Sequence, residues 1–218
     1  MKAMAMLAGC VVTVGACRGD GGNPDCDAAI TGITDTSVAP VYLGEAAGAL
    51  RVRCRAFRDT MVILPRAGWT DTLPAKRIII AGVVPVLAIH DGRHITALRV
   101  TTPGLRTADT VEVGSSVARF RDRPGVQVAY ARAARAALLR ERTRCGTTFE
   151  LSRWGGPAPP AEDQPPAAGP ELASWADAIL VTAITVSRCM NPSTHAAIDS
   201  VFDARDDSLA MRDTAMPP

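Results

Sequence analysis

The hydrophobic pattern of the chain opens with an apolar run. Lys2 is the only charged residue among the first 16, and residues 3–16 are apolar or small except for Thr13. A basic start, an apolar stretch of this length and small residues at its end are typical of a secretory signal. The run is shorter than the roughly 20 apolar residues that cross a bilayer. We therefore expect a signal peptide over residues 1–16.

Beyond residue 40 the pattern is mainly that of β-strands separated by turns. The runs rich in Ile, Val and Thr are 61–64, 77–90, 93–101, 126–130, 147–151 and 179–186. Asp91-Gly92 is a preferred sequence for a two-residue type I′ turn, which predicts a hairpin around it. The pairs expected in this hairpin are His90 with Arg93, Ala88 with Ile95 and Val86 with Ala97.

Two segments share a pattern that predicts short helices. Residues 41–51 read VYLGEAAGALR and residues 111–121 read VEVGSSVARFR. Each has an apolar start, a glycine, small or polar residues and then apolar residues at helical spacing. We expect Leu50 in the first helix, and Val117 and Phe120 in the second, to face a core. Because β-type runs follow both copies, the pattern indicates a two-fold internal repeat.

Three further segments complete the expected organisation. Residues 131–142 favour a helix by their Ala, Leu, Arg and Glu content, whereas comparison with the first half favours a strand in the latter part. Residues 155–170 contain six prolines and are expected to form an extended loop. Residues 190–218 are expected to hold one helix and a disordered end.

The predicted fold class is α+β. We expect a single antiparallel sheet of about six or seven strands with short helices on one face. This domain spans residues 38–189 and follows a polar tether over residues 17–37. The chain has 24 basic and 22 acidic residues, a near balance that argues against a nucleic-acid partner.

Four of the six cysteines lie beyond residue 17, and an even number in an exported chain indicates disulfides. Zinc is the competing interpretation, which the absence of a CxxC motif and of nearby histidines disfavours. If the strands at 147–151 and 179–187 pair antiparallel, Cys145 and Cys189 lie at neighbouring ends. Cys26 and Cys54 then pair by elimination.

Candidate catalytic and metal-binding residues are few. The sequence has no G-x-S-x-G, H-E-x-x-H or P-loop motif. His90 and His94 flank the predicted turn and would point to opposite faces, which disfavours a shared metal site. The tryptophans near loops, which could pack in a core or form a ligand platform, are Trp69, Trp154 and Trp175. We expect no cofactor, no metal and no catalytic residue.

Val14-Gly15-Ala16-Cys17 resembles the lipobox of bacterial lipoproteins. The resemblance implies that Cys17 receives a diacylglyceryl group and that signal peptidase II cuts before it. Leu7-Ala8-Gly9-Cys10 also fits, but only about five apolar residues precede it, too few for a signal. A buried N-terminal helix is the remaining alternative. Arg18 replaces the aspartate that often retains lipoproteins at the inner membrane, which favours the periplasmic face of the outer membrane.

Several motifs in the domain resemble a group of uncharacterised lipoproteins from high-GC bacteria. They are Pro103-Gly104-Leu105-Arg106-Thr107-Ala108-Asp109, Val113-Gly114-Ser115, and Cys145-Gly146 followed by Phe149-Glu150-Leu151. A looser similarity of pattern is to the small lipoprotein of the outer-membrane β-barrel assembly machine and to the β-lactamase-inhibitor-protein fold. Those are α+β modules whose sheet binds other proteins, and a likeness of fold is weak support for a function.

The sequence therefore predicts a lipid-anchored cell-envelope protein that acts as a non-enzymatic binding or structural module. The expected partners are the membrane, through the lipid, and another envelope protein. The alternatives are a small-ligand-binding or sensor lipoprotein and a periplasmic enzyme. A broad exposed face of the sheet would favour a protein partner, and a deep polar pocket would favour a ligand or catalysis.

Overall fold

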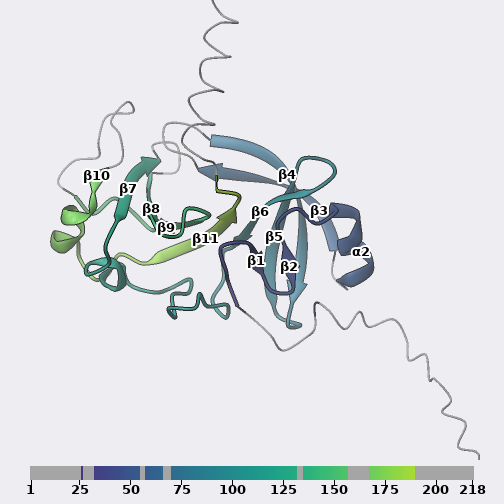
Figure 1. The fold of residues 1–218 in the computed structure, drawn as a ribbon, viewed down its shortest axis with the longest axis horizontal. Helices are drawn as coiled ribbons and strands as arrows, with labels where there is room; N and C mark the ends of the chain where they lie inside the picture. Colours follow the sequence, from purple (N-terminus) through teal and green to yellow (C-terminus); the bar gives the residue numbers. More distant parts are fainter. Residues whose placement is uncertain are drawn as a thin grey trace, which may run out of the picture.

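The computed structural model describes residues 26, 32–54, 57–65, 70–131, 135–156 and 167–189. The fold is mostly β, with a two-stranded sheet beside an antiparallel sheet of nine strands (Figure 1). The small sheet is formed by β1 (Ser37–Val38) and β2 (Val41–Tyr42). The large sheet contains β3 (Phe57–Pro65), β4 (Thr70–Ile80), β5 (Val84–His90), β6 (Ile95–Val100), β7 (Val126–Ala131), β8 (Ala136–Glu141), β9 (Thr147–Leu151), β10 (Ala167–Ala168) and β11 (Val181–Ser187).

The helices of the described part are short. They are η1 (Ala47–Ala49), α2 (Leu50–Arg53), η2 (Val117–Phe120) and η4 (Gly169–Ser174). Leu50, Val117 and Phe120 are fully buried, as the sequence predicts for both short helices. Among the described residues, no helix has the length and apolar character needed to cross a bilayer.

The order of strands across the large sheet reveals two related halves. This order is β10-β7-β8-β9-β11-β6-β5-β4-β3. The first half of the chain supplies β3 to β6, the second supplies β7, β8, β9 and β11, and the halves meet where β6 pairs with β11 (Figure 1). Without the two-residue β10, the order is symmetric about the β6–β11 pair: each half runs in chain order from its first strand at the edge to its last strand at the centre. The inferred internal repeat requires this symmetry.

Matching backbone hydrogen bonds at the start of each half support the repeat. In both halves a glycine N–H donates to the carbonyl oxygen of the first residue of the last strand, β6 or β11. The N–H of that strand residue donates to the carbonyl oxygen of the residue after the glycine. The four bonds, each 2.8 Å long, are Gly44 to Ile95, Ile95 to Glu45, Gly114 to Val181 and Val181 to Ser115. Gly44 and Gly114 have φ of 86° and 95°, a region that favours glycine.

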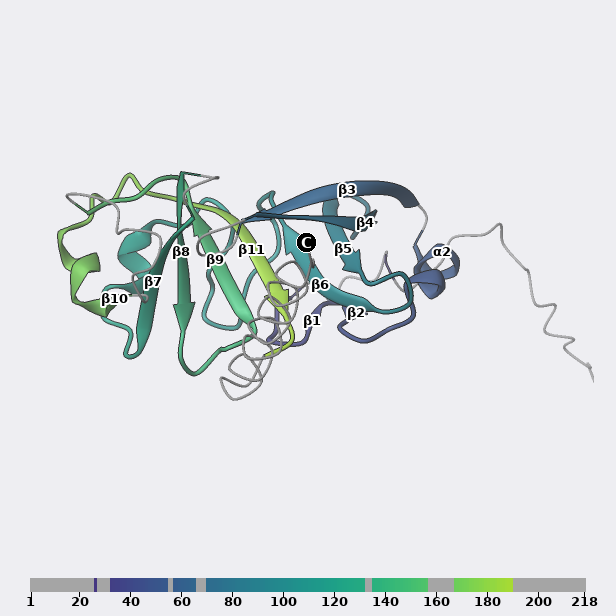
Figure 2. The same ribbon diagram turned by 90° about the horizontal axis from the view of Figure 1, so that it is seen from above.

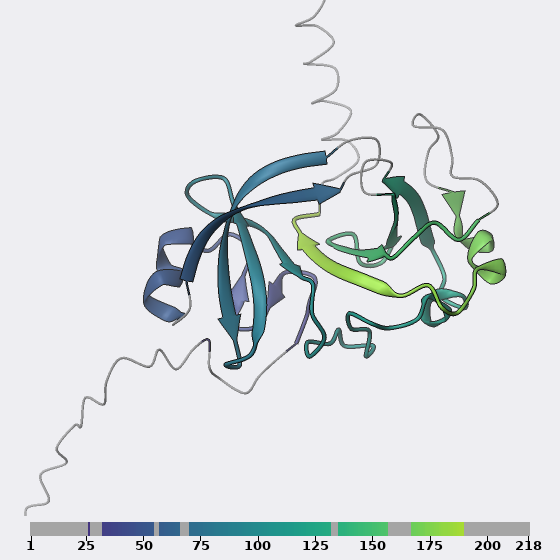
Figure 3. The same cartoon turned by 180° about the vertical axis from the view of Figure 1, so that it is seen from behind.

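Hydrophobic clusters lie on both faces of the large sheet. The main hydrophobic core lies on the face that packs against Leu50, Phe120 and Trp175. A smaller cluster on the opposite face, which we call the outer face, consists of Val62, Leu64, Ala75, Ile89 and Ala97. β4 pairs with β5 only from residue 75 onwards, so the distal part of the β3–β4 hairpin extends past β5, towards β11 (Figures 2 and 3).

The predicted fold class is correct only in part. The antiparallel sheet is present, but the fold is mostly β rather than α+β, and it has a nine-stranded and a two-stranded sheet instead of one sheet of six or seven strands. Residues 77–90 are not one strand but parts of β4 and β5, because Ala81 and Gly82 adopt φ of 50° and 73° and form a turn. For segment 131–142 the sequence leaves a helix and a strand open, and the latter part forms strand β8, as the comparison with the first half favours. Its residues 136–139 are all buried between β7 and β9, and this packing outweighs the helix propensity of Ala and Leu.

The β5–β6 hairpin is confirmed, but its predicted register is wrong. The observed pairs are His90 with Ile95, Ala88 with Leu98 and Val86 with Val100. The loop is longer than two residues because Asp91 Oδ1 accepts the backbone N–H groups of Arg93 and His94, at 2.8 Å each. This loop shifts the following strand relative to the two-residue turn.

Both disulfides form with the predicted pairing. Cys145 and Cys189 lie beside the ends of β9 and β11, and their Cα atoms are 5.2 Å apart. Cys26 and Cys54 have a Cα separation of 5.1 Å. The signal peptide, Cys17, most of the tether and of the proline-rich loop, and residues 190–218 lie outside the described residues.

The two halves offer a matched pair of glycine substitutions. Gly114→Ala should lower the free energy of unfolding by about 1 kcal/mol, because a side chain at positive φ is strained although no atom lies within 4 Å of the new Cβ. Gly48→Ala, equally unobstructed and without a positive φ, should leave stability unchanged or raise it by about 0.5 kcal/mol. Urea unfolding measures both, and equal effects would contradict the role assigned to Gly114.

Candidate functional site

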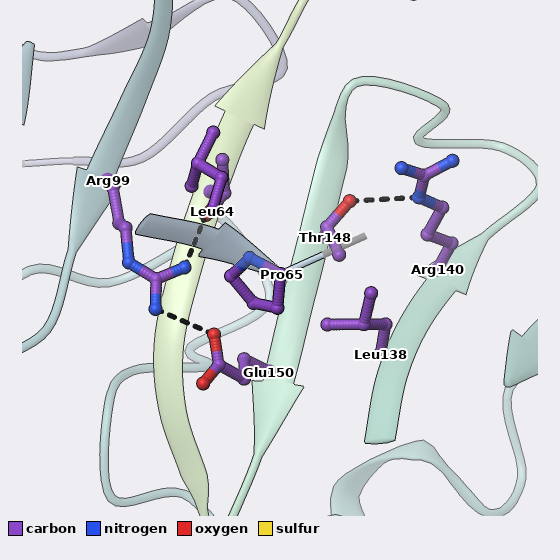
Figure 4. A pocket seen from close by; sticks show the side chains of 8 residues that line it. Leu64, Pro65, Arg99, Leu138, Arg140, Thr148 and Glu150 are labelled. Carbon is purple, nitrogen blue, oxygen red and sulfur yellow. Dashed lines mark hydrogen bonds and ion pairs between the residues drawn. The ribbon is translucent and has the colours of Figure 1, made fainter. Parts of the chain in front are cut away.

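The outer face carries a polar centre at the junction of the two halves. Alternating side chains of β6, β11 and β9 point to the same face, and the pairings place Arg99 beside Thr185 and Thr185 beside Thr148. Arg99 donates to Glu150 Oε2 at 2.6 Å and to Thr185 Oγ1 at 3.3 Å (Figure 4). The Arg99–Glu150 ion pair therefore spans β11 and links the two halves.

The distal end of β3 flanks this polar centre. Leu64 and Pro65 line a small cleft together with Arg99, Glu150 and neighbouring side chains (Figure 4). The cleft volume is about 10 Å³, which is about the space of one water molecule. The Arg99 and Glu150 side chains are only 11% and 16% exposed, and they neutralise each other. This geometry suits a structural ion pair better than a site for a metabolite.

A second charged cluster joins four segments of the second half. Arg123 Nη1 contacts Asp109 and also Glu141, the latter at 2.6 Å. Arg144 Nη1 contacts Asp109 at 2.6 Å. The Arg123 guanidinium lies over the Phe120 ring, 4.9 Å from its centroid. The cluster contains two acidic and two basic side chains, so it is neutral and internally satisfied.

Asp109 is the most perturbed acid of this cluster. Partial burial raises its pKa, but hydrogen bonds from Thr107 and Arg144 and the charge of Arg123 outweigh burial and lower the pKa to about 2. The same contacts raise the pKa of Arg144 despite its partial burial. A carboxylate held this firmly in its charged form is a poor proton donor or acceptor near neutral pH.

The motif residues of the lipoprotein resemblance are placed as structural supports. Arg106 pairs with Glu112 at 2.9 Å, and the Thr107 hydroxyl bonds both the N–H and the carbonyl of Val111. Gly146 lies against backbone, and a Cβ there would stand 2.6 Å from the Ser187 carbonyl oxygen. Each of these residues stabilises a turn or a close contact, and none contributes to an open pocket.

Those of the remaining candidates that the structure describes do not gather at one site. His90 Nδ1 accepts the Gly92 N–H at 3.1 Å, so His90 serves the hairpin loop. Trp154 and Trp175 pack edge to face with ring centroids 5.0 Å apart, and Trp175 is buried in the main core. Trp69 lies outside the described residues. Within the described ranges, no group of His, Cys, Asp or Glu side chains has metal-binding geometry.

The open edge of the sheet is the feature that the sequence analysis missed. β3 is an edge strand of nine residues, whereas the opposite edge is the two-residue β10. Met61 and Ile63 of β3 are 60% and 63% exposed. The alternate residues of the strand, Val62 and Leu64, are buried on the outer face. No local pattern could reveal that β3 ends the sheet, or that Met61 and Ile63 lie in the part of the β3–β4 hairpin that extends past β5. A long edge with exposed apolar side chains is suited to pairing with another strand.

The charged cluster predicts a pH dependence of stability. The pKa of Asp109 is about 2 in the folded state against an ordinary value of 3.8, so its contribution is present above about pH 4 and is lost as the pH falls towards 2. Asp109→Asn should cost about 1–2 kcal/mol of unfolding free energy at pH 7, and the deficit should shrink below pH 4. Urea unfolding across pH measures this. The exposed Asp59→Asn is the control and should change little, and a pH-independent deficit in Asp109→Asn would contradict the assignment.

Comparisons with known proteins leave the family open. No protein-family model matches the chain, and no curated protein matches it. Among solved structures, the chain is similar to the crystal structure of the uncharacterized protein yfeY from Escherichia coli. That similarity has a TM-score of 0.44 and 14% sequence identity, and it covers 72% of this chain and 97% of the other.

Proposed function

We propose that this protein is a lipoprotein of the cell envelope that binds a protein partner through the open edge of β3. The export signal and the lipobox-like Cys17 support the anchoring, with the periplasmic face of the outer membrane as the location. The two disulfides support an oxidising compartment. The activity is binding, without a chemical step.

Within the described residues, β3 pairs with another strand on one side only and carries exposed apolar side chains, and this combination supports the proposal. Along an antiparallel edge strand, alternate residues direct their N–H and C=O groups away from the sheet, and an extended segment of a partner can pair with them. Met61 and Ile63 would supply cross-strand contacts on one face of the added strand. Val62 and Leu64 pack against the sheet and hold β3 in place, so the edge is ordered before binding.

The two alternative functions have less support. The Arg99–Glu150 cleft offers little support for a small ligand or substrate, because its volume of about 10 Å³ admits one water molecule. Opening that cleft would require moving Leu64 off the outer-face cluster, where it is only 2% exposed.

A photo-reactive amino acid tests the edge directly in living cells. Placed at Met61 or Ile63 of the full chain, it should form one defined covalent adduct with an envelope protein. Placed at the exposed Ala178, near η4, it should form none. A reactive group at Thr60 should also form the adduct in the otherwise native chain and lose it in the Met61→Lys, Ile63→Lys double variant, because edge lysines oppose strand addition. Thermal unfolding of that variant should be unchanged, since both positions are exposed.

The outcomes of this experiment separate the alternatives. Equal adducts from positions 61, 63 and 178 would contradict a specific edge. An adduct of twice the chain mass would replace the partner by a second copy of this chain. Palmitate labelling provides the anchoring control: the label should vanish in Cys17→Ser and persist in Cys10→Ser. The reverse result would place the lipid on Cys10 and contradict the assignment to Cys17.

A further inference from the structure

Two exposed valines each lie two residues away in the chain from a residue that contacts Cys26. The Cys26–Cys54 disulfide attaches the tether to the end of α2, and the Cys26 carbonyl accepts the Ala81 N–H at 2.8 Å. Val52 precedes Cys54 by two residues and Val83 follows Ala81 by two, and each valine is 78% exposed. These are the most exposed large apolar side chains of the described part of the chain. The exposed Arg51 lies next to Val52.

The length of the tether limits where this end of the domain can be. Cys17 and Cys26 are nine residues apart, so the part of the tether between them spans at most about 30 Å when fully extended. Since the disulfide fixes Cys26, the end of the domain that carries Arg51, Val52 and Val83 is the end nearest to the lipid. We call these three residues the tether-side patch.

We infer that the tether-side patch rests on the surface of the bilayer that holds the lipid anchor. This inference rests on the proposed lipid anchoring. Apolar side chains partition into the headgroup region, and a nearby arginine favours anionic lipids. The contacts are few, but the anchor already holds the domain at the surface, so weak contacts suffice to bias its orientation.

This orientation keeps the β3 edge accessible. β3 begins at Phe57, just after α2, and its nine residues extend about 30 Å to Pro65. The strand therefore leads away from the tether-side patch, and η4 and β10 lie at the opposite end of the sheet (Figure 1). Met61 and Ile63 would face the periplasm, not the lipid.

Depth-dependent fluorescence quenching tests the inference on the full lipidated chain. A fluorescent amino acid is placed at Val52, Val83 or the exposed Ala178, and the protein is bound to phosphatidylcholine–phosphatidylglycerol vesicles whose headgroups carry a quencher. Quenching should be several-fold stronger at positions 52 and 83 than at position 178. A label at the exposed Gly48 should also be quenched, and should lose this quenching in a Val52→Asp, Val83→Asp variant that still floats with the vesicles.

Failure of this inference differs from failure of the anchoring. Flotation with equal quenching at all positions would overturn the orientation and leave the anchor in place. Persistent quenching at Gly48 in the double variant would also overturn it. Loss of flotation in the otherwise native chain would overturn the anchoring and the inferred orientation together.

Discussion

The pairing of β6 with β11 is the interaction on which the rest of the structure depends. It turns two four-stranded halves into one continuous sheet and makes the last strand of each half a central strand. Both strands are buried on both faces: Leu98 and Ile184 are fully buried on one face, and Ala97 and Ala183 nearly so on the other. The Arg99–Glu150 ion pair crosses the same junction, and the Cys145–Cys189 disulfide closes the end of β11.

The parts of the fold that the sequence predicted depend on local patterns. The glycine-led starts at Gly44 and Gly114 and the buried Leu50 and Phe120 follow from spacing within short segments. For β8 the sequence left a helix and a strand open, because its Ala and Leu residues favour a helix locally and its pairing with β7 and β9 depends on the sheet order. The hairpin register was missed for a different reason, since the Asp91 side chain replaces the backbone contacts of a two-residue turn.

The candidate site was less predictable than the fold. Asp109 and Arg144 are 35 residues apart, and Arg99 and Glu150 are 51 apart, so their pairing requires the sheet order. The same holds for the β3 edge, whose exposure results from β3 being last in the sheet. The conspicuous polar residues stabilise turns and the junction of the halves, which leaves the apolar edge of β3 as the surface best suited to recognition.

The central structural claim is that the two halves form one cooperative unit through β6 and β11. Native-state amide hydrogen exchange in low concentrations of denaturant measures this most directly. The account predicts that amides of β6 and β11 are the slowest to exchange and share one opening free energy, equal to that of global unfolding. Exchange of the β11 amides under conditions where β6 remains protected would show that the halves unfold separately, and would contradict the account.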